Sequence, residues 1–332
     1  MFPTQRFPFV TPLLVVSSFV LALAGCSKSE TPGAGGAPSP AHVLKVGFAQ
    51  TGAESVWRTA NSASMKAEAE KRHLDFKFSD GEGKQENQIR AIRSFIAQGV
   101  DAIIVAPIVE SGWDPVLREA KAAHIPVLIT DRTIQTQDES LYSAFLGSDF
   151  FQEGKMVADW LAAHAKDGKG RIVELQGTPG SAPANERQRA FADGIKPYPG
   201  LQIIDSQSGD FRRAGGKEVM EALLKKHGKD IDIVYSHNDD MALGAIQAIE
   251  EAGLKPGQDI MVVTIDGIRE ALQAIIEGKI NCCVECNPLF GPKAFDTVEK
   301  LVKGEPVPKK IFNKDELFDA TNTPGLIAAR QY

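Results

Sequence analysis

Polar and aromatic side chains follow the apolar runs of this sequence at many places where a strand would end. In "IDIVYSHNDDMALGAIQAIEEAG" (231–253), a short apolar run leads directly into Asn238, Asp239 and Asp240. Other such positions hold Trp57, Arg58, Asp131, Arg132, Arg187, Phe211, Asp266, Glu285 and Asn287. Arg offers a planar fork of donors and Asp two acceptor oxygens, so both can bind neighbouring hydroxyls, while a flat ring covers an apolar C–H face. These residue types favour the binding of a small polyhydroxylated molecule.

A simpler structural role is open for each of these residues. Asp and Asn after a strand commonly cap the next helix, an Asp before a Gly can serve a turn, and most aromatic residues belong to the core. In the opening segment we expect Asn238 to be a ligand contact, Asp239 to be a second contact or an orienting group, and Asp240 to be a helix cap. The joint placement at strand ends, more than any single residue, predicts a binding site.

The elements that must position these residues alternate along the chain. Nine apolar runs are expected to be strands, over residues 43–50, 74–80, 101–107, 125–131, 171–177, 201–208, 232–238, 260–266 and 280–286. Most are continuous runs, as in parallel strands that are covered on both faces. Helical patterns lie between them: in "ENQIRAIRSFIAQG", Ile89, Ile92 and Ile96 recur at helical spacing and Gly99 follows the end. Alternating strands and helices predict right-handed βαβ units and parallel sheets.

The alternation occurs in two similar runs, so we expect an α/β fold with two similar Rossmann-like lobes. In open parallel sheets, ligands bind beyond the carboxyl ends of the strands. The candidate residues occupy those ends in both runs.

Composition and motifs exclude several function classes. The 332 residues are 43% apolar and 24% charged, with a formal net charge of −6, which offers no general attraction for nucleic acid. No G-x-S-x-G, H-E-x-x-H or cofactor fingerprint occurs, so we expect neither an enzyme nor a cofactor. The His residues form no pair at metal spacing, so no metal site is expected. Cys282, Cys283 and Cys286 are expected to be buried thiols, with a disulfide as the main alternative.

The N-terminus predicts export. Arg6 precedes an apolar segment that stops at Cys26 in "LALAGCSKSE", and such a segment has the character of a signal peptide. The residues around Cys26 resemble the lipobox of bacterial lipoproteins, so residues 1–25 would be a lipoprotein signal peptide and Cys26 would be lipidated. Residues 26–42 are rich in Gly, Ser, Pro and Ala and would form a flexible tether. An uncleaved signal anchor is the alternative.

Several long blocks of the sequence resemble one family. They are "VGFAQTGAESVWRTA", "KQENQIRAIRSFIAQGVDAIIVAPIVESGWDPVLREAK", "ITDR", "VELQGTPGSAPANERQRAF", "SQSGDFRRAGGKEVMEALL", "YSHNDDMALGAIQAIEEAGLKPG" and "TIDG". The chain is similar to the periplasmic sugar-binding proteins of ABC transporters, in particular the galactofuranose-binding type, and more distantly to the ribose-binding type. The resemblance extends from Val43 to about Pro308.

The resemblance implies the type I periplasmic binding protein fold, in which three segments cross between the lobes, here near residues 145, 286 and 315. Residues 43–145 and 287–314 would form the N-terminal lobe, and residues 146–286 and 315–332 the C-terminal lobe. It also implies that a monosaccharide is captured by hinge closure and passed to a membrane permease with its ATPase. Its site residues would be Trp57, Arg58, Asp131, Arg132, Arg187, Phe211, Asn238 and Asp266, with Glu285 or Asn287 near the hinge.

The partners and location follow from the same reasoning. We expect a monomer that is anchored through Cys26 on the periplasmic or cell-surface face of a membrane. A repressor of the lactose type shares the two-lobed fold, but the export segment and the lack of an N-terminal helix-turn-helix argue against it. A lipid-anchored sensor that presents sugar to a chemoreceptor or a histidine kinase is the alternative function.

Overall fold

Two parallel-stranded sheets organise the part of the chain that the computed structural model describes, residues 42–332. The first sheet has the order β11-β5-β4-β3-β1-β2, and all its neighbouring strands are parallel. Its strands are β1 (Lys45–Gln50), β2 (Asp75–Asp80), β3 (Ala102–Val105), β4 (Val127–Thr130), β5 (Ala144–Gly147) and β11 (Lys310–Phe312). We call this sheet and its helices the first lobe.

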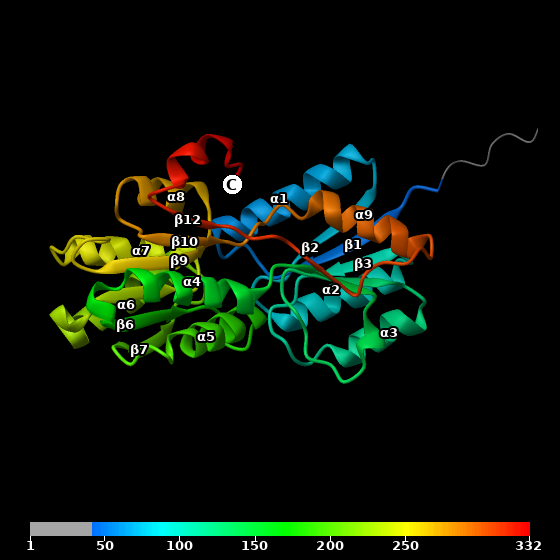
Figure 1. Cartoon of the computed structure of the whole chain (residues 1–332). Coiled ribbons are helices and arrows are strands. Elements are labelled where there is room, and N and C mark those ends of the chain that lie inside the picture. The colour runs from blue at the N-terminus through cyan, green and yellow to red at the C-terminus, as the bar shows by residue number, and fades with distance from the viewer. Residues whose placement is uncertain (1–41) are drawn as a thin grey trace, which may run out of the picture. The chain divides into compact units, whose positions relative to one another are not determined.

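The helices of the first lobe cover both faces of its sheet (Figure 1). They are α1 (Val56–Lys71), α2 (Gln85–Ala97), α3 (Asp114–Ala122) and α9 (Gly291–Val302). The apolar residues of α1 and α9 share one core cluster, and those of α2 and α3 form another with alternate residues of β3 and β4. Both β3 and β4 are buried throughout, as expected of parallel strands between two helix layers.

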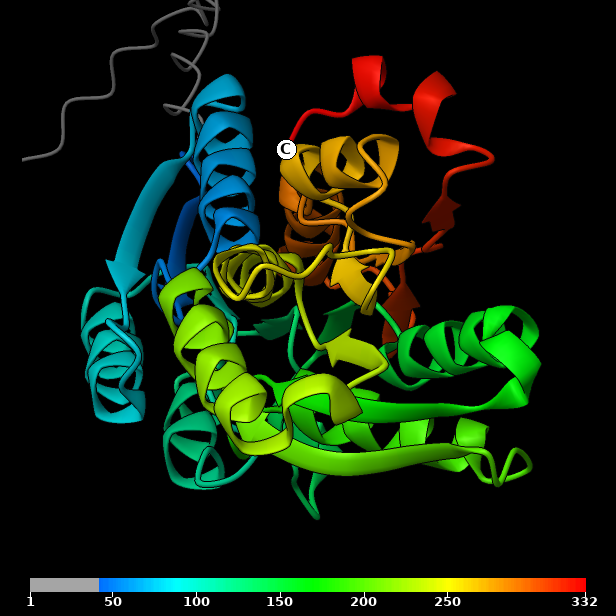
Figure 2. The ribbon, with the colours of Figure 1, turned by 90° about the vertical axis from the view of Figure 1, so that its left-hand side faces the viewer.

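The second lobe repeats this plan. Its sheet has the order β12-β10-β9-β8-β6-β7, and only the edge pair of β10 and β12 is antiparallel. Its strands are β6 (Gly170–Gln176), β7 (Leu201–Ser208), β8 (Ile233–Ser236), β9 (Met261–Asp266), β10 (Cys282–Glu285) and β12 (Leu317–Asp319). Its helices are α4 (Phe150–His164), α5 (Ala182–Ile195), α6 (Arg213–His227), α7 (Asp239–Glu251) and α8 (Arg269–Ile276). Figure 2 shows the lobe from its end, with the helices on both sides of the strands.

The expected strands are all present, and three short ones are additional. Each of the nine predicted runs contains or overlaps an observed strand within the described residues. The helix expected around Ile92 is α2, which buries Ile92 and Phe95 and is followed by Gly99 at a φ of 61°. β5, β11 and β12 were not expected, because none of them lies in a long apolar run of the sequence.

Three segments cross between the sheets, as the two-lobed fold requires. Residues 148–149 join β5 to α4, residues 286–290 join β10 to α9, and residues 313–316 join β11 to β12. We call these the first, second and third crossing. In residues 42–332, no helix has the length and apolarity needed to span a bilayer. The predicted signal segment, Cys26 and the tether fall outside the described part of the chain.

Candidate functional site

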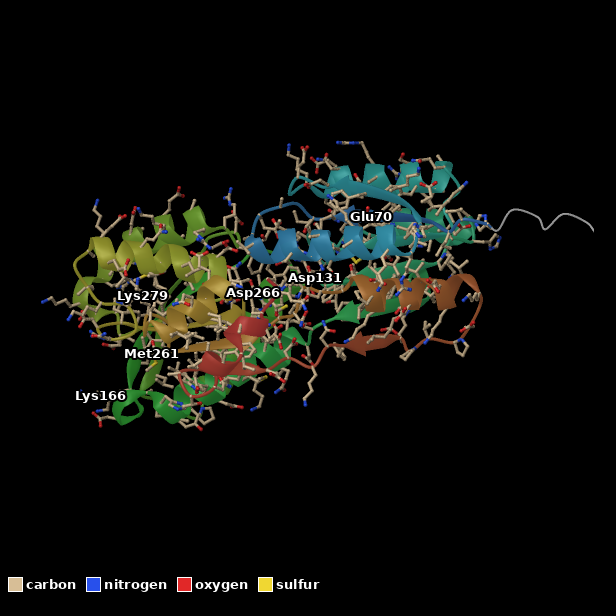
Figure 3. The ribbon with its side chains drawn as sticks, turned by 90° about the horizontal axis from the view of Figure 1, so that it is seen from above. Glu70, Asp131, Lys166, Met261, Asp266 and Lys279 are labelled. Atoms are coloured by element: carbon tan, nitrogen blue, oxygen red, sulfur yellow. The ribbon has the colours of Figure 1, made fainter. Side chains whose placement is uncertain are left out.

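The carboxyl ends of strands from both sheets meet at one group of polar side chains. Figure 3 shows this for Asp131, which follows β4, and Asp266, which ends β9. The group is lined by Glu54, Ser55, Trp57, Arg58, Asp131, Arg132, Phe150, Pro183, Arg187, Phe211, Asn238, Asp266 and Cys286. Eight of the residues predicted from the sequence are among them, with contributions from both lobes. This interlobe site has the location that the rule for open parallel sheets predicts.

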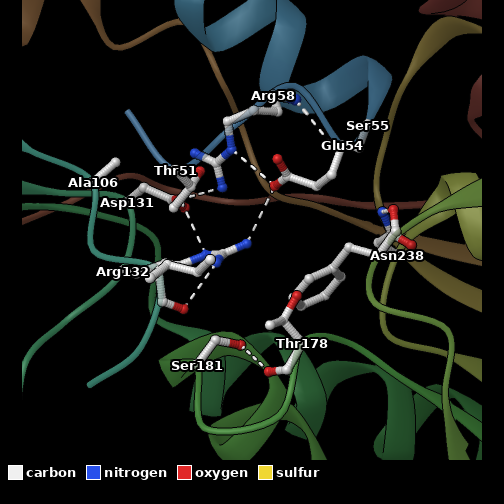
Figure 4. Close-up of polar contacts among 12 residues, drawn as sticks. Thr51, Glu54, Ser55, Arg58, Ala106, Asp131, Arg132, Thr178, Ser181 and Asn238 are labelled. Carbon is white, nitrogen blue, oxygen red and sulfur yellow. Dashed lines mark hydrogen bonds and ion pairs between the residues drawn. The ribbon is translucent and has the colours of Figure 1, made fainter. Parts of the chain in front are cut away.

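In the first lobe, two arginines and two carboxylates form a buried network (Figure 4). Arg58 lies 2.6 Å from Asp131 and 3.1 Å from Glu54. Arg132 lies 3.4 Å from Glu54 and 3.6 Å from Asp131, and it donates to the carbonyl of Ile108. Asp131 and Arg132 are therefore not an exposed surface pair, since both are 3% exposed.

The network holds both arginines in the charged form at neutral pH. Burial opposes the charge of Arg58, but the Asp131 and Glu54 carboxylates raise its pKa above the ordinary value. Burial and the neighbouring Arg58 cation lower the pKa of Arg132 to about 10. Burial acts to raise the pKa of Glu54, yet Arg58 and Arg132 bring it below the ordinary value. Charges of both signs therefore face the cleft. None of the shifted pKa values of Glu54, Arg58 and Arg132 lies near pH 7, so these three groups are not suited to proton transfer at that pH.

In the second lobe, Arg187 occupies the centre of the corresponding network. Its Nε atom donates to Glu153 at 2.8 Å, and its other donors reach the carbonyl of His237 and, at 3.9 Å, the carboxylate of Asp266. Burial acts to lower the pKa of Arg187, but the Glu153 carboxylate raises it, and the net result is a pKa above the ordinary value. Burial raises the pKa of Asp266 well above its ordinary value, against the opposing effect of Arg187.

An aromatic ring accompanies each of the three arginines. The guanidinium of Arg58 lies 4.6 Å from the centre of the Trp57 ring, and that of Arg132 lies 5.2 Å from Phe211, which belongs to the other lobe. The guanidinium of Arg187 lies 5.1 Å from Phe150. Planar cations over ring faces lose part of their freedom to move. The rings and the guanidinium planes therefore give the site fixed, flat walls.

Three residues of the site have left-handed backbone conformations. Asp131 has a φ of 62°, Phe211 of 61° and Asp266 of 135°. Such values are costly for residues other than Gly, and they concentrate at functional sites where the surrounding structure enforces them. Behind the Phe211 ring lies Gly177, where a Cβ atom would come within 1.9 Å of the ring. The sequence requires Gly at this position so that Phe211 can take its place in the cleft.

Asn238 lines the cleft and also caps α7. Its Oδ1 atom accepts a hydrogen bond from the backbone of Met241, and its Nδ2 atom donates to the carbonyl of Phe211. The expectation that Asp240 caps the helix is wrong, because Asn238 holds the N-cap position. Asp240 instead accepts a hydrogen bond of 2.7 Å from the backbone N–H of Val56, the first residue of α1 in the other lobe.

Three predicted residues lie outside the lining of the interlobe site. Asp239 is fully buried and accepts from the backbone of Gly267 and Ile268 and from Thr264, so it orients the turn that carries Asp266. Glu285 binds Arg330 and Tyr332 near the C-terminal end. Asn287 caps its own turn by accepting from Leu289. These partners use the polar atoms that would otherwise be available to a ligand.

The lining also includes residues that the sequence analysis did not assign to the site. They are Glu54, Ser55, Phe150, Pro183 and Cys286. The space left between all the lining side chains is about 20 Å³, roughly the room that one water molecule needs. A wider cavity of about 420 Å³ shares Glu54 and Arg132 with the site. In this conformation the lobes are closed on one another, so a larger molecule enters only when they separate.

The described cysteines are free and buried, as the thiol interpretation expects. They are Cys282, Cys283 and Cys286. Burial raises the pKa of each thiol well above its ordinary value, which makes the thiols poor nucleophiles. Cys286 reaches the site and also accepts a hydrogen bond from the Trp57 indole through its carbonyl.

Comparison with known proteins agrees with this geometry. A family model of the periplasmic binding protein domain matches residues 46–306. The galactofuranose-binding protein YtfQ of Escherichia coli (strain K12) is 51% identical over 270 residues, which cover 81% of this chain and 85% of that protein.

Two solved structures are similar over most of the chain. The periplasmic binding protein component of the arabinose ABC transporter from Shewanella sp. ANA-3, bound to α- and β-L-arabinofuranose, is 48% identical, with a TM-score of 0.84 and coverage of 87% of this chain and 96% of that one. A Mycobacterium smegmatis protein in complex with β-D-fucofuranose is 50% identical, with a TM-score of 0.84 and coverage of 87% and 96%. The chain therefore belongs to the periplasmic binding protein family.

Proposed function

We propose that the chain is the sugar-binding component of an ABC importer, and that its ligand is an aldose in the furanose form. The observation that carries this proposal is the interlobe site, where three arginines, three carboxylates and three aromatic rings converge. A sugar hydroxyl can donate to a carboxylate and accept from a guanidinium at the same time. The paired charges of this site suit such two-sided hydrogen bonding.

The ring form is suggested by the relatives. Galactofuranose, arabinofuranose and fucofuranose appear in the names of the three similar proteins described above. A five-membered ring with an exocyclic carbon chain presents its hydroxyls differently from a six-membered ring, so a fixed set of buried partners separates the two forms. The alternative of a sugar sensor is less well supported, because these relatives are named as binding or transporter proteins.

Binding would proceed by hinge motion. The sugar enters between separated lobes, and closure brings Arg58 and Arg132 of the first lobe and Arg187 of the second onto it. The closed form is then stabilised by contacts that exist only when both lobes touch the ligand. Recognition of this form by a membrane permease with its ATPase would complete import, as the family implies.

The location follows from the sequence and the family. We infer that the protein is exported and acts as a monomer, tethered to a membrane by a lipidated Cys26. Several acyl chains give stable anchoring where one does not. Mass spectrometry of the protein from membranes tests this: an acylated N-terminal Cys26 supports the anchor, and an unmodified or intact N-terminus contradicts it.

A thermal-shift comparison of ring forms tests the proposed function. A ligand that binds only the folded protein must raise the melting temperature. We expect shifts with L-arabinose and D-galactose, and a larger shift with methyl β-D-galactofuranoside than with methyl β-D-galactopyranoside. A preference for the pyranoside would contradict the furanose assignment, and no shift with any sugar would contradict sugar binding altogether.

A further inference from the structure

His237 is fully buried directly after β8, next to the α7 cap Asn238. The backbone N–H of Gly177 donates to its Nδ1 atom at 3.3 Å, and its Nε2 atom lies 3.1 Å from Oε1 of Glu174. Its carbonyl accepts a hydrogen bond of 2.6 Å from Arg187. His237 does not line the interlobe site itself, so any effect on a ligand must pass through these partners.

The two ring contacts determine where the proton of His237 lies. A backbone N–H can only donate, so the Nδ1 atom that faces Gly177 must be unprotonated in order to accept. The ring proton is therefore on Nε2, where it is donated to the Glu174 carboxylate. Burial lowers the pKa of His237 below its ordinary value, against the opposing effect of Glu174. The ring is thus a neutral bridge between a carboxylate and a backbone amide.

Glu174, at one end of this bridge, is held from several sides. It is 1% exposed, and its Oε2 atom accepts from the side chains of Gln176, Gln188 and Ser206. These donors belong to β6, α5 and β7. A buried carboxylate whose oxygens are all bonded has a fixed position. The His237 ring is therefore anchored to the interior of the second lobe.

Gly177, at the other end, supports a wall of the cleft. Its N–H is bound by His237, and its carbonyl accepts a hydrogen bond of 2.7 Å from the hydroxyl of Ser208. The Phe211 ring packs directly on this backbone, where a Cβ atom on Gly177 would lie 1.9 Å from the ring. The same ring faces Arg132 of the other lobe at 5.2 Å. A shift of the Gly177 peptide would therefore displace the wall.

We propose that His237 is a positioning residue for the interlobe site. Its ring, protonated at Nε2, ties the backbone of Gly177 to Glu174 and so holds the Phe211 ring in place against the ligand. This inference rests on the proposed function, because Phe211 is assigned to the sugar.

A ¹⁵N spectrum of the histidine side chains tests the position of the proton and requires no sugar. The His237 signals are identified by their absence in His237→Asn. At about pH 7.5, above the ordinary His pKa of 6.5, we expect a protonated Nε2 and an unprotonated Nδ1. A proton on Nδ1, or on both nitrogens, would overturn the proposal, because the Gly177 N–H would then have no acceptor on this ring.

Asn and Gln each reproduce one half of the His237 ring. Asn places its side-chain oxygen near the position of Nδ1, so His237→Asn keeps an acceptor for Gly177 but does not reach Glu174. Gln places its amide nitrogen near the position of Nε2, so His237→Gln keeps a donor for Glu174 and loses the acceptor for Gly177. Both variants should lower the melting temperature, because each leaves a buried group unpaired.

Sugar affinity should separate the two variants where stability does not. In calorimetric titrations with L-arabinose, we expect His237→Asn to bind within about twofold of the wild type and His237→Gln to bind about fivefold more weakly. His164→Gln changes an exposed histidine of the same lobe and is the matched control. Equal loss of affinity in His237→Asn and His237→Gln would show that the ring serves stability alone, and the inference would fail.

A fluorine label on the wall reports its position without a ligand. With 4-fluorophenylalanine at residue 211 alone, we expect the ¹⁹F signal to be unchanged in His237→Asn and shifted or broadened in His237→Gln. If the wild type binds L-arabinose and the signal is unchanged in His237→Gln, the inference fails while the proposed function stands. If the wild type binds no sugar, the proposed function fails, and the ¹⁵N and ¹⁹F spectra still decide whether His237 positions the Phe211 ring.

Discussion

The hydrogen bond between Asp240 and Val56 connects the two lobes. We expect it to stabilise the closed form, and we call it the interlobe latch. Asp240 Oδ2 accepts the backbone N–H of Val56 at 2.7 Å. On the opposite side, Asp240 lies 3.2 Å from Arg213, which in turn forms a bidentate pair with Glu270. Asp240 is 4% exposed in this conformation, with Val56 on one side and Arg213 on the other.

The free energy that this hydrogen bond contributes to the closed form follows from the charge of its acceptor. A hydrogen bond to a charged group contributes about 1.5–3 kcal/mol, and a carboxylate at a helix N-terminus also gains from the helix dipole. If the closed form alone loses a hydrogen bond with the lower value, about 1.5 kcal/mol, sugar binding becomes about tenfold weaker. The loss should appear mainly as faster dissociation, since the latch forms after the sugar is captured.

Two independent substitutions remove this bond from its two sides. Asp240→Ala removes the acceptor. Val56→Pro removes the donor and is tolerated at the first position of a helix, and the extended backbone of Ser55 suits a following proline. Isothermal titration with L-arabinose should give about tenfold weaker binding for each single variant and no further loss in the double variant.

A control and a refuting result complete this test. Glu251→Ala removes an exposed carboxylate from the other end of α7 and should leave the affinity unchanged. The melting temperature without sugar should change little in Asp240→Ala, because Arg213 keeps its bond to Glu270. If the two single effects simply add in the double variant, Asp240 and Val56 do not act through one bond and the latch is refuted.

Other predictions address the site itself. Arg132→Ala should weaken L-arabinose binding at least about tenfold with little change in the melting temperature, whereas Asn238→Ala should lower both, because the helix cap contributes about 1 kcal/mol; equal loss of stability in both variants would indicate structural roles. Gly177→Ala should displace the Phe211 ring and weaken binding in a titration without unfolding the protein; unchanged affinity would show that the ring is not a wall of the site. The lowered pKa of Glu54 predicts stability that is present above pH 4.5 and lost at lower pH, and Glu54→Gln should reduce this slope in thermal melts at several pH values.

The alternation of strands and helices could be predicted from the sequence because it rests on long apolar runs. Residues 101–107 and 125–131 contain β3 and β4, which are buried on both faces and are apolar except for Thr130 at the end of β4. β5 is equally buried and of the same length, but Ser143 and Ser148 flank it, so no longer apolar run marks it in the sequence, and β11 and β12 have three residues each. So short a strand is defined by its neighbours in the sheet, and the local pattern carries little of that information.

The site could be predicted in part, for a related reason. Arg132 follows β4 directly, and Trp57 and Arg58 lie in the first turn of the helix that follows β1. A parallel sheet brings such strand ends and the helix starts after them together. Glu54 was missed although it lies four residues before Arg58, a spacing that favours an ion pair. The cap assignment failed because Asn238, Asp239 and Asp240 can all cap a helix, and only the approach of α1 from the other lobe gives Asp240 a different partner.

Residues near the crossings could not be assigned from the chain alone. Glu285 follows a strand as a ligand contact would, yet Arg330 and Tyr332 occupy its carboxylate from a segment distant in sequence. Glu153 gives the opposite case, since it lies within a helix and no strand-end rule indicates it. Its partner Arg187 lies on another helix, and the two side chains meet only in the folded chain.

The most direct test of sugar binding between the lobes is a calorimetric titration of the wild type, Arg132→Ala and Arg187→Ala with L-arabinose. One arginine belongs to each lobe, so a sugar held by both lobes must lose affinity when either is removed. The account predicts one sugar per chain for the wild type and at least about tenfold weaker binding for each variant. Undiminished binding in either variant would show that the sugar does not contact that lobe and would contradict the account.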